Sequence, residues 1–355
     1  MKIGIITMIS DNYGNRLQNY ALQEVLHDLG NSVETLNNPW SEKYNDYLER
    51  IKFAIKKVVF YITKKPERFK RKLSFVRFNN DNIHFSQFWL NKKKDKMYAN
   101  EYYDLFVCGS DQVWNSEARE INGKYFADFA DHKKRASYAA SFGIECIIED
   151  RKSEFKNYLL GMNHISVREQ SGIKIVEALI NVTPKYHIDP TLLLSSEKWD
   201  KLANKYKKMV NKYIFCYFLG KPSEKILNKL QKYKKINNLT IASIWSKSDG
   251  NCNNVGPEEF LSLIKNAEFV LTDSFHGTVF SIIYHKPFYT FSRNGVKESM
   301  DTRVISLLDT LNLGERFDPE NLNLNAVYEI DFQKADCILN EEKKKAINYL
   351  SIITR

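Results

Sequence analysis

Residues 268–291 read EFVLTDSFHGTVFSIIYHKPFYTF and contain a complete strand–helix–strand unit. An apolar run ends at Asp273, and the turn at 273–277 leads at once into an apolar helical segment and then into PFYTF at 287–291. Short apolar strands joined by a helix predict a parallel β-α-β unit whose strands are buried on both faces. His276 then lies on the strand-to-helix turn, where we expect it to be exposed near a helix N-terminus and able to act as a general acid or base.

The same alternation runs through most of the chain. KIGIIT (2–7) is followed by an amphipathic helix at 16–29 and by SVETLN (32–37), which forms a second β-α-β unit. The loop SDNYGN between the first strand and this helix does not match GxGxxG, so an ordinary dinucleotide site is not expected. The remaining apolar runs that we interpret as strands lie at 103–109, 135–141, 164–169, 213–220 and 239–245, and we interpret KYHIDP at 185–190 as the exit from the first domain.

Strands that alternate with helices twice over predict an α/β fold of two Rossmann-like domains facing a cleft. We place the N-terminal domain at 1–190, with a basic, aromatic insertion at about 41–100. The C-terminal domain is placed at 191–325 and carries the DSFHG turn. A helical tail at 326–355 can pack back on the N-terminal domain.

The composition is that of a folded protein. The 355 residues include 53 Lys plus Arg against 43 Asp plus Glu, a net charge of +10, and only 14 glycines. Collagen-like and low-complexity proteins are excluded by this composition. The five cysteines are scattered and form no CxxC pair, and we find no signal peptide and no apolar run of about 18 residues. We therefore expect a reduced, cytoplasmic protein.

Five of the few glycines fall in loops that follow predicted strands. Glycine lets backbone amides approach a ligand, which suits anion binding at a helix N-terminus. The alternative for any one loop is that a strand-to-helix connection needs turn residues. The loops are SDNYGNR (10–16), GSDQVWN (109–115), SFG (141–143), SVREQSG (166–172) and DSFHG (273–277).

These motifs, in this order, resemble the polysaccharide pyruvyl transferase family. The resemblance runs from about 1 to about 310 and rests on NYGNRLQNYALQ, GSDQVWN, SFG, SVRE, HIDPTLLL and TDSFHG. It implies a fold similar to two-domain glycosyltransferases of the GT-B type. It also implies transfer of the enolpyruvyl unit of phosphoenolpyruvate to a sugar as a cyclic pyruvate ketal. Arg168 and His276 match functional positions of the family, but Ser274 stands where many members have an arginine.

The predicted site is a set of anion-binding and proton-transfer groups. Phosphoenolpyruvate carries a carboxylate and a phosphate, so we expect arginines to bind it, Arg168 first and Arg303 next. His276 and Asp111 are the candidate catalytic acid and base, although an aspartate in a GSD turn is commonly a helix N-cap. The other expected substrate-binding residues are Arg16, for which a structural ion pair is an equal alternative, and Asn15, Ser110, Gln112, Ser274 and Gly277. No metal-binding spacing is present, so we expect neither a metal nor a cofactor beyond the donor substrate.

The excess positive charge gathers away from these motifs, partly in IKFAIKKVVFYITKK (51–65). Its pattern predicts a basic amphipathic helix that can lie on an anionic membrane, and an ordinary surface helix is the alternative. We find no nucleic-acid-binding motif and expect no nucleic-acid partner.

The expected function is modification of a sugar or lipid-linked oligosaccharide in the biosynthesis of bacterial surface polysaccharides, such as capsule or exopolysaccharide. Two alternatives stay open. The first is a GT-B glycosyltransferase that uses a nucleotide sugar, and the second is a non-catalytic binding protein of polysaccharide assembly.

Overall fold

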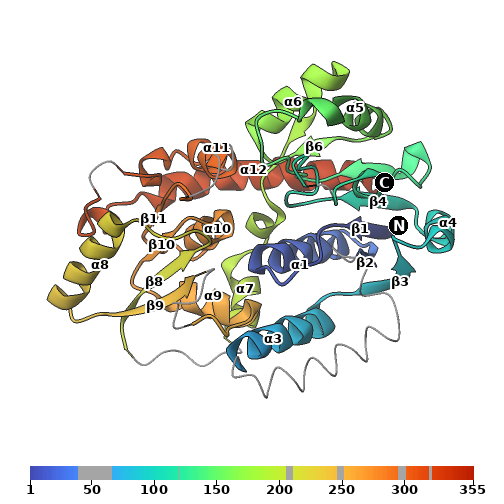
Figure 1. Cartoon of the computed structure of the whole chain (residues 1–355). Coiled ribbons are helices and arrows are strands. Elements are labelled where there is room, and N and C mark those ends of the chain that lie inside the picture. The colour runs from blue at the N-terminus through green and yellow to red at the C-terminus, as the bar shows by residue number, and fades with distance from the viewer. Residues whose placement is uncertain (39–65, 119, 205–210, 246–251, 295–300, 320–321) are drawn as a thin grey trace. The chain divides into compact units, whose positions relative to one another are not determined.

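The computed structural model describes residues 1–38, 66–118, 120–204, 211–245, 252–294, 301–319 and 322–355 (Figure 1). The predicted membrane-facing helix at 51–65 lies outside these ranges. The chain divides into two compact units. Unit 1 comprises Met1–Leu193 together with Glu342–Arg355, and unit 2 comprises Leu194–Glu341.

Unit 1 is built on a parallel sheet. Within the described residues the sheet has five strands in the order β3-β2-β1-β4-β5. The strands are β1 (Lys2–Ile6), β2 (Ser32–Asn37), β3 (Phe85–Trp89), β4 (Leu105–Cys108) and β5 (Arg135–Ser137). The chain runs outward from β1 in one direction and then returns to place β4 on the other side of β1. The strand order therefore reverses between β1 and β4, which is where ligands bind in open α/β sheets.

A short strand pair extends this sheet beyond β5. β6 (Ser166–Val167) pairs in parallel with β7 (Lys185–Tyr186). Two isolated bridges, Ala136 to His164 and Ala140 to Val167, connect β6 to the segment around β5. The loop after β6 consequently lies beside the loop after β5, and that loop lies beside the loop after β4.

Helices connect the strands of unit 1. They are α1 (Tyr13–Asp28), α3 (Pro66–Asn82), α4 (Lys93–Tyr102), α5 (Lys152–Leu160) and α6 (Gln170–Ile180), followed by a 3-10 turn at Pro190–Leu193. The observed α1 begins three residues before the predicted helix. Asn12 caps it by accepting a hydrogen bond from the Asn15 N–H, and the helix ends shortly before Gly30, which has a positive φ of 83°.

The part of the 41–100 region that the structure describes is regular. Residues 66–100 contain α3, β3 and most of α4, and β3 pairs in parallel with β2 at the sheet edge. The sequence pattern missed β3 because FSQFW mixes polar and aromatic residues, which suits a partly exposed edge strand. α3 packs on α1, where the Tyr13 and Phe75 rings lie 5.3 Å apart.

Aromatic packing fixes the loops above the sheet of unit 1. The buried Trp114 ring stacks on Phe126 at a centroid distance of 4.9 Å and lies 5.4 Å from Phe142. Full burial of such large rings contributes about 2–3 kcal/mol each, so the 109–115 and 141–143 loops belong to the hydrophobic core.

Unit 2 contains a second parallel sheet. Its described strands follow the order β11-β10-β8-β9, so the order reverses between β8 and β10. The strands are β8 (Tyr213–Phe218), β9 (Thr240–Trp245), β10 (Val270–Thr272) and β11 (Phe288–Thr290). The helices are α7 (Ser196–Ala203), α8 (Glu224–Ile236), α9 (Pro257–Asn266), α10 (Phe275–Ile283) and α11 (Thr302–Thr310). Two parallel sheets with helical crossovers confirm the predicted α/β class.

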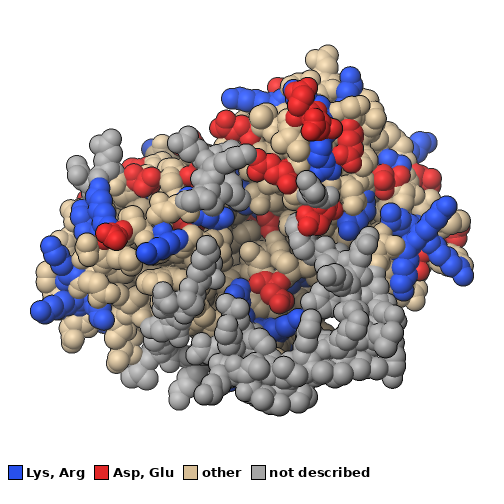
Figure 2. Space-filling model, in the orientation of Figure 1, with Lys and Arg blue, Asp and Glu red and all other residues tan. Residues whose placement is uncertain are grey.

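The C-terminal helix α12 (Phe332–Ile353) belongs to unit 2 in its first half and to unit 1 from Glu342 onward. In unit 1 the hydroxyl of Tyr349 donates a hydrogen bond of 2.9 Å to the Ser137 carbonyl. Part of the positive surface charge lies on unit 2. Figure 2 shows blue side chains gathered over α8, whose Lys225, Lys232 and Lys235 are exposed.

Candidate functional site

The first group of polar residues lies where β1 and β4 of unit 1 end. Gln18, on the first turns of α1, joins the two strand ends. Its Nε2 donates to Thr7 Oγ1 at 2.8 Å, and its Oε1 accepts from the Ser110 N–H at 3.0 Å. Both Gln18 and Ser110 are buried, so this bridge fixes the strand ends in a dry environment.

Asp111 extends from the β4 end of this group. Its backbone has a φ of 70°, which a side-chain-bearing residue adopts only under constraint. The Asn15 Nδ2 donates to Asp111 Oδ2, and the Gln112 N–H donates to Oδ1 at 2.9 Å. Asp111 does not cap a helix here, in contrast to the alternative that its GSD turn suggests. Its carboxylate instead faces the side chains of Asn15 and Arg168.

Arg168 is enclosed by carboxylates. Its side chain is 1% exposed, and its Nη1 pairs with Oδ2 of Asp189, which is fully buried. Nη2 lies 3.5 Å from Asp111 Oδ1, and Nη1 lies 3.4 Å from Ser110 Oγ. Burial lowers the pKa of Arg168, but the charges of Asp189, Asp111 and Glu169 outweigh burial and leave that pKa raised. The guanidinium is therefore charged and already neutralised by its neighbours.

Arg16 and Gln112 lie at the border of the same group. Arg16 is fully buried in the first turn of α1, where it donates to the Met8 carbonyl and to Asn19 Oδ1 at 3.3 Å. Burial lowers the pKa of Arg16 to about 10, while Asp11 and Asp111 act in the opposite direction. Gln112 packs directly on Gly143, where an added Cβ would lie 1.9 Å from Gln112 Nε2.

The second group lies in unit 2, at the turn between β10 and α10. Ser274 is the N-cap of α10 and accepts a hydrogen bond of 3.4 Å from the Gly277 N–H. His276 follows on the first turn and is only 6% exposed, so the prediction of an exposed histidine is wrong. The cause is close packing, because the strand end and the helix start are in direct contact at Gly277. A Cβ there would lie 2.4 Å from Thr272 Oγ1.

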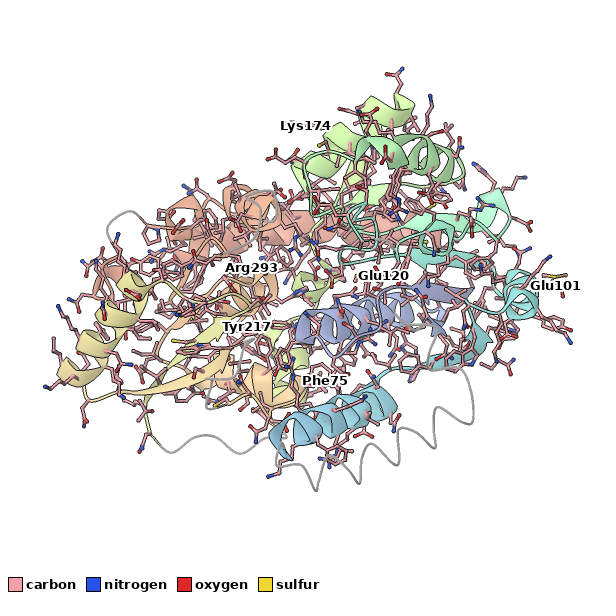
Figure 3. All side chains as sticks on the ribbon, in the orientation of Figure 1. Phe75, Glu101, Glu120, Lys174, Tyr217 and Arg293 are labelled. Carbon is pink, nitrogen blue, oxygen red and sulfur yellow. The ribbon has the colours of Figure 1, made fainter. Side chains whose placement is uncertain are left out.

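Asp273 holds the neighbouring strand ends of unit 2 together. Its Oδ1 accepts from the Leu219 N–H at 2.6 Å and its Oδ2 from the Gly220 N–H at 2.7 Å, so β8 and β10 are joined. Arg293, three residues after β11 and labelled in Figure 3, approaches Asp273 Oδ2 to 3.7 Å through its Nε. Burial raises the pKa of Asp273, while the two N–H groups and Arg293 lower it.

Arg303 completes the second group. The residue lies in the first turn of α11 rather than in a strand-end loop, and it is buried. Its guanidinium carbon is 5.9 Å from the centre of the Phe275 ring, which itself lies 5.1 Å from the His276 ring. Arg303 and His276 therefore approach the same aromatic side chain at the N-terminus of α10.

The predicted residues thus form two groups, each at the point where the strand order of its own sheet reverses. Unit 1 brings together Asn15, Arg16, Ser110, Asp111, Gln112 and Arg168, and unit 2 brings together Ser274, His276, Gly277 and Arg303. Sequence reasoning missed Asp189, Gln18 and Asp273. Asp189 lies in the quoted HIDP motif and Asp273 in the TDSFHG motif, so an acidic residue within a strand-end motif was the available signal. Gln18 gave no signal beyond its place in NYGNRLQ.

Two general features of the described residues bear on cofactors and membranes. Among them, no cluster of three or more His, Cys, Asp or Glu side chains is placed to hold a metal ion. None of the helices in the described ranges combines the length and the apolarity that crossing a bilayer requires.

The chain is similar in fold to solved structures of proteins with different sequences. The match to the Staphylococcus aureus MnaA-UDP co-structure covers 95% of this chain and 90% of that chain, with 11% sequence identity and a TM-score of 0.50. The match to the wall teichoic acid polymerase TagF covers 99% of this chain and 88% of that chain, with 10% sequence identity and a TM-score of 0.51. At this identity the likeness concerns the fold, and it agrees with the predicted two-domain architecture of the GT-B type.

Comparison of the sequence with protein families gives a more specific result. A family model described as polysaccharide pyruvyl transferase matches residues 12–295, which include both groups of polar residues except Arg303. No protein of curated function matches the sequence.

Proposed function

Because the chain belongs to the polysaccharide pyruvyl transferase family, we propose that it is a ketal-forming enzyme that transfers the enolpyruvyl unit of phosphoenolpyruvate to two hydroxyls of a sugar. The family match over residues 12–295 is the observation that carries this proposal. The acceptor is a sugar or a lipid-linked oligosaccharide of a bacterial surface polysaccharide.

The reaction needs one proton donor and one proton acceptor. A proton adds to the methylene carbon of phosphoenolpyruvate and makes it a methyl group, while a sugar hydroxyl attacks the neighbouring carbon. The second hydroxyl then displaces phosphate and closes the ketal. Of the two hydroxyl protons, one balances the proton taken up by the methyl group and the other leaves with phosphate or solvent. His276 is the candidate acid and Asp111 the candidate base.

The anionic donor suits the group in unit 2. Phosphoenolpyruvate brings a carboxylate and a phosphate, which need cations and backbone N–H groups. The N-terminus of α10 supplies the N–H groups, and Arg293 and Arg303 supply the positive charge. Ser274 caps the helix, so we propose that these two arginines replace the arginine that many family members have at that position.

The hydroxylated acceptor suits the group in unit 1. There Arg168 and Arg16 lie among the carboxylates of Asp111, Asp189 and Glu169, so an additional anion would meet net negative charge. A neutral sugar avoids this repulsion, and the carboxylate of Asp111 can accept a hydrogen bond from its hydroxyl. Arg168, predicted from sequence as the first donor-binding residue, is therefore proposed to hold Asp111 in place and charged.

Phosphate release tests this function. The purified 355-residue chain is incubated with phosphoenolpyruvate and a panel of sugars carrying a free hydroxyl pair, and phosphate and the ketal methyl signal are measured together. We expect both products with one acceptor and neither with His276→Ala. His285→Ala is the matched control, because His285 is exposed and pairs with Asp336.

Each alternative function predicts a different result. A nucleoside diphosphate released from a nucleotide sugar would replace the proposal with glycosyl transfer. Sugar binding without turnover, unaffected by His276→Ala, would indicate a non-catalytic binding protein.

We also propose that the enzyme is cytoplasmic and associates peripherally with anionic membranes through 51–65. Charge and apolar spacing in the sequence of that segment support this. Co-sedimentation with vesicles of an anionic lipid should be lost when Lys52, Lys56, Lys57, Lys64 and Lys65 are changed to Gln. Unchanged co-sedimentation would exclude this segment as the anchor.

A further inference from the structure

Glu169 is a buried carboxylate next to Arg168 that the proposed reaction does not use. It is fully buried at the N-terminus of α6, and its side chain does not cap that helix. Its Oε1 instead accepts three hydrogen bonds from the 141–143 loop, from Ser141 Oγ at 3.1 Å, the Phe142 N–H at 2.8 Å and the Gly143 N–H at 3.1 Å. Oε2 is buried and, among the described residues, accepts no hydrogen bond.

Such a carboxylate is expensive to bury. An ionised group out of water is tolerated when hydrogen bonds and a nearby opposite charge compensate it. Three donors compensate one oxygen, Oε1, and the charge of Arg168 acts on the carboxylate as a whole. A carboxylate that is retained although its burial destabilises the fold suggests a role beyond packing.

The 141–143 loop, which Glu169 holds, is hydrogen-bonded to the backbone of Asp111. The Ser141 N–H donates to the Asp111 carbonyl at 2.9 Å, and the Trp114 N–H donates to the Ser141 carbonyl at 3.1 Å. Asp111 also bridges Ala140 in parallel. These contacts hold the backbone of Asp111 on both sides of its left-handed conformation, and that conformation determines where the carboxylate points.

We propose that Glu169 is a positioning residue, which holds the 141–143 loop and through it aims the Asp111 carboxylate at Asn15 and Arg168. The catalytic consequence rests on the function proposed above, whereas the positioning itself does not. Glu169 is predicted to act on turnover through Asp111 and not through contact with substrate.

Amide hydrogen exchange of the 355-residue chain tests the positioning. In Glu169→Ala we expect exchange at Phe142, Gly143 and Trp114 to accelerate by about tenfold or more, with β1 and β8 unchanged. Glu169→Gln keeps an acceptor oxygen and should stay within about threefold of the wild type. Glu145→Gln, an exposed glutamate two residues beyond the loop, is the matched control.

Two results would overturn the proposal. Unchanged exchange at Trp114 in Glu169→Ala would show that the loop does not transmit the constraint, and equal acceleration in β1 would show a general loss of stability. If Glu169→Ala does not fold, the same exchange measurement on Ser141→Ala tests the positioning role. Loss of its single hydroxyl contact should accelerate exchange at Phe142 and Gly143 by about threefold, and no change there would reject the role.

Kinetic measurements then distinguish failure of the positioning proposal from failure of the proposed function. Phosphate release by Glu169→Ala should fall in kcat by about tenfold while KM for phosphoenolpyruvate stays within about twofold. A changed KM with an unchanged kcat would contradict action through Asp111. If the wild type releases no phosphate with any acceptor, the proposed function fails, and the exchange result still judges the positioning role.

Discussion

Units 1 and 2 place polar groups at equivalent points of two similar sheets but differ in their balance of positive and negative charge. In unit 1 the guanidinium groups of Arg168 and Arg16 lie among the carboxylates of Asp189, Asp111 and Glu169. In unit 2 the carboxylate of Asp273 accepts two backbone hydrogen bonds, and Asp301 is a second carboxylate that interacts with Arg293. Arg303 lies near Phe275 at the N-terminus of α10. The same topology therefore holds an excess of carboxylates in unit 1, whereas in unit 2 cations balance the carboxylates beside a helix N-terminus, which favours an anion.

This difference is the basis on which we propose which substrate each unit binds. Arginines look equivalent in a sequence, but their value for binding an anion depends on which carboxylates already neutralise them. The comparison predicts that changes in unit 1 affect stability and the acceptor, whereas changes in unit 2 affect the donor.

The largest effect is expected from the ion pair of unit 1. Asp189→Ala leaves the buried guanidinium of Arg168 without its main partner and also removes the acceptor of the Thr191 N–H. We expect a loss of about 3–5 kcal/mol in the free energy of unfolding, measured by urea denaturation. Asp150→Ala, at an exposed position of unit 1, should change it by less than about 0.5 kcal/mol. If Asp189→Ala loses as little stability as Asp150→Ala, other groups compensate the charge of Arg168.

Donor affinity tests unit 2 against unit 1. Arg303→Ala should weaken phosphoenolpyruvate binding by about 10–100-fold, since a charge-assisted hydrogen bond contributes about 1.5–3 kcal/mol. Asp111→Asn should leave the Kd of phosphoenolpyruvate within about twofold and reduce turnover instead. Titration calorimetry without acceptor measures the Kd of phosphoenolpyruvate for both variants, and phosphate release with acceptor measures turnover. Weaker binding in Asp111→Asn than in Arg303→Ala would reverse the assignment of the two substrates.

A buried histidine of unit 1, His187, gives a test based on the pH dependence of stability. His187 is buried, with Nδ1 2.8 Å from Ser166 Oγ and its ring 4.5 Å from that of Tyr349 on α12. Burial, with Lys185 and Lys345 acting in the same direction, lowers the pKa of His187 to about 4. The unfolded chain, with a histidine pKa of about 6.5, binds more protons between these values, so this stabilisation is complete above about pH 6.5 and declines towards pH 4.

Between pH 7 and pH 5 this term should lower the free energy of unfolding by about 2 kcal/mol. His187→Gln should remove that part of the pH dependence, and His132→Gln, at an exposed position of unit 1, should retain it. The measurement is urea denaturation at both pH values. Identical pH dependence in the wild type and in His187→Gln would show that His187 does not carry it.

The sequence predicted the alternation of elements well because buried parallel strands are nearly continuous apolar runs and their polar ends are easily seen. SVETLN matches β2 residue for residue, and the DSFHG turn leads into α10 as predicted. The enclosure of Arg168 was not predictable in this way, because Asp189 is 21 residues away and meets it only through the pairing of β6 with β7. The burial of His276 depends on how tightly Gly277 packs on Thr272, which a local pattern does not report.

That tight contact gives the smallest expected effect and the most local test of unit 2. A methyl group at Gly277 would lie 2.4 Å from Thr272 Oγ1, so Gly277→Ala must shift the start of α10 away from β10. We expect a loss of about 1–2 kcal/mol in the free energy of unfolding, as for other overpacked sites, together with weaker phosphoenolpyruvate binding. Gly30→Ala is the control, because its added methyl group would contact nothing within 4 Å and only its positive φ opposes the change. A Gly277→Ala protein that loses stability but binds phosphoenolpyruvate normally would mean that the position of the α10 N-terminus does not determine donor affinity, and it would remove the helix from the proposed donor site.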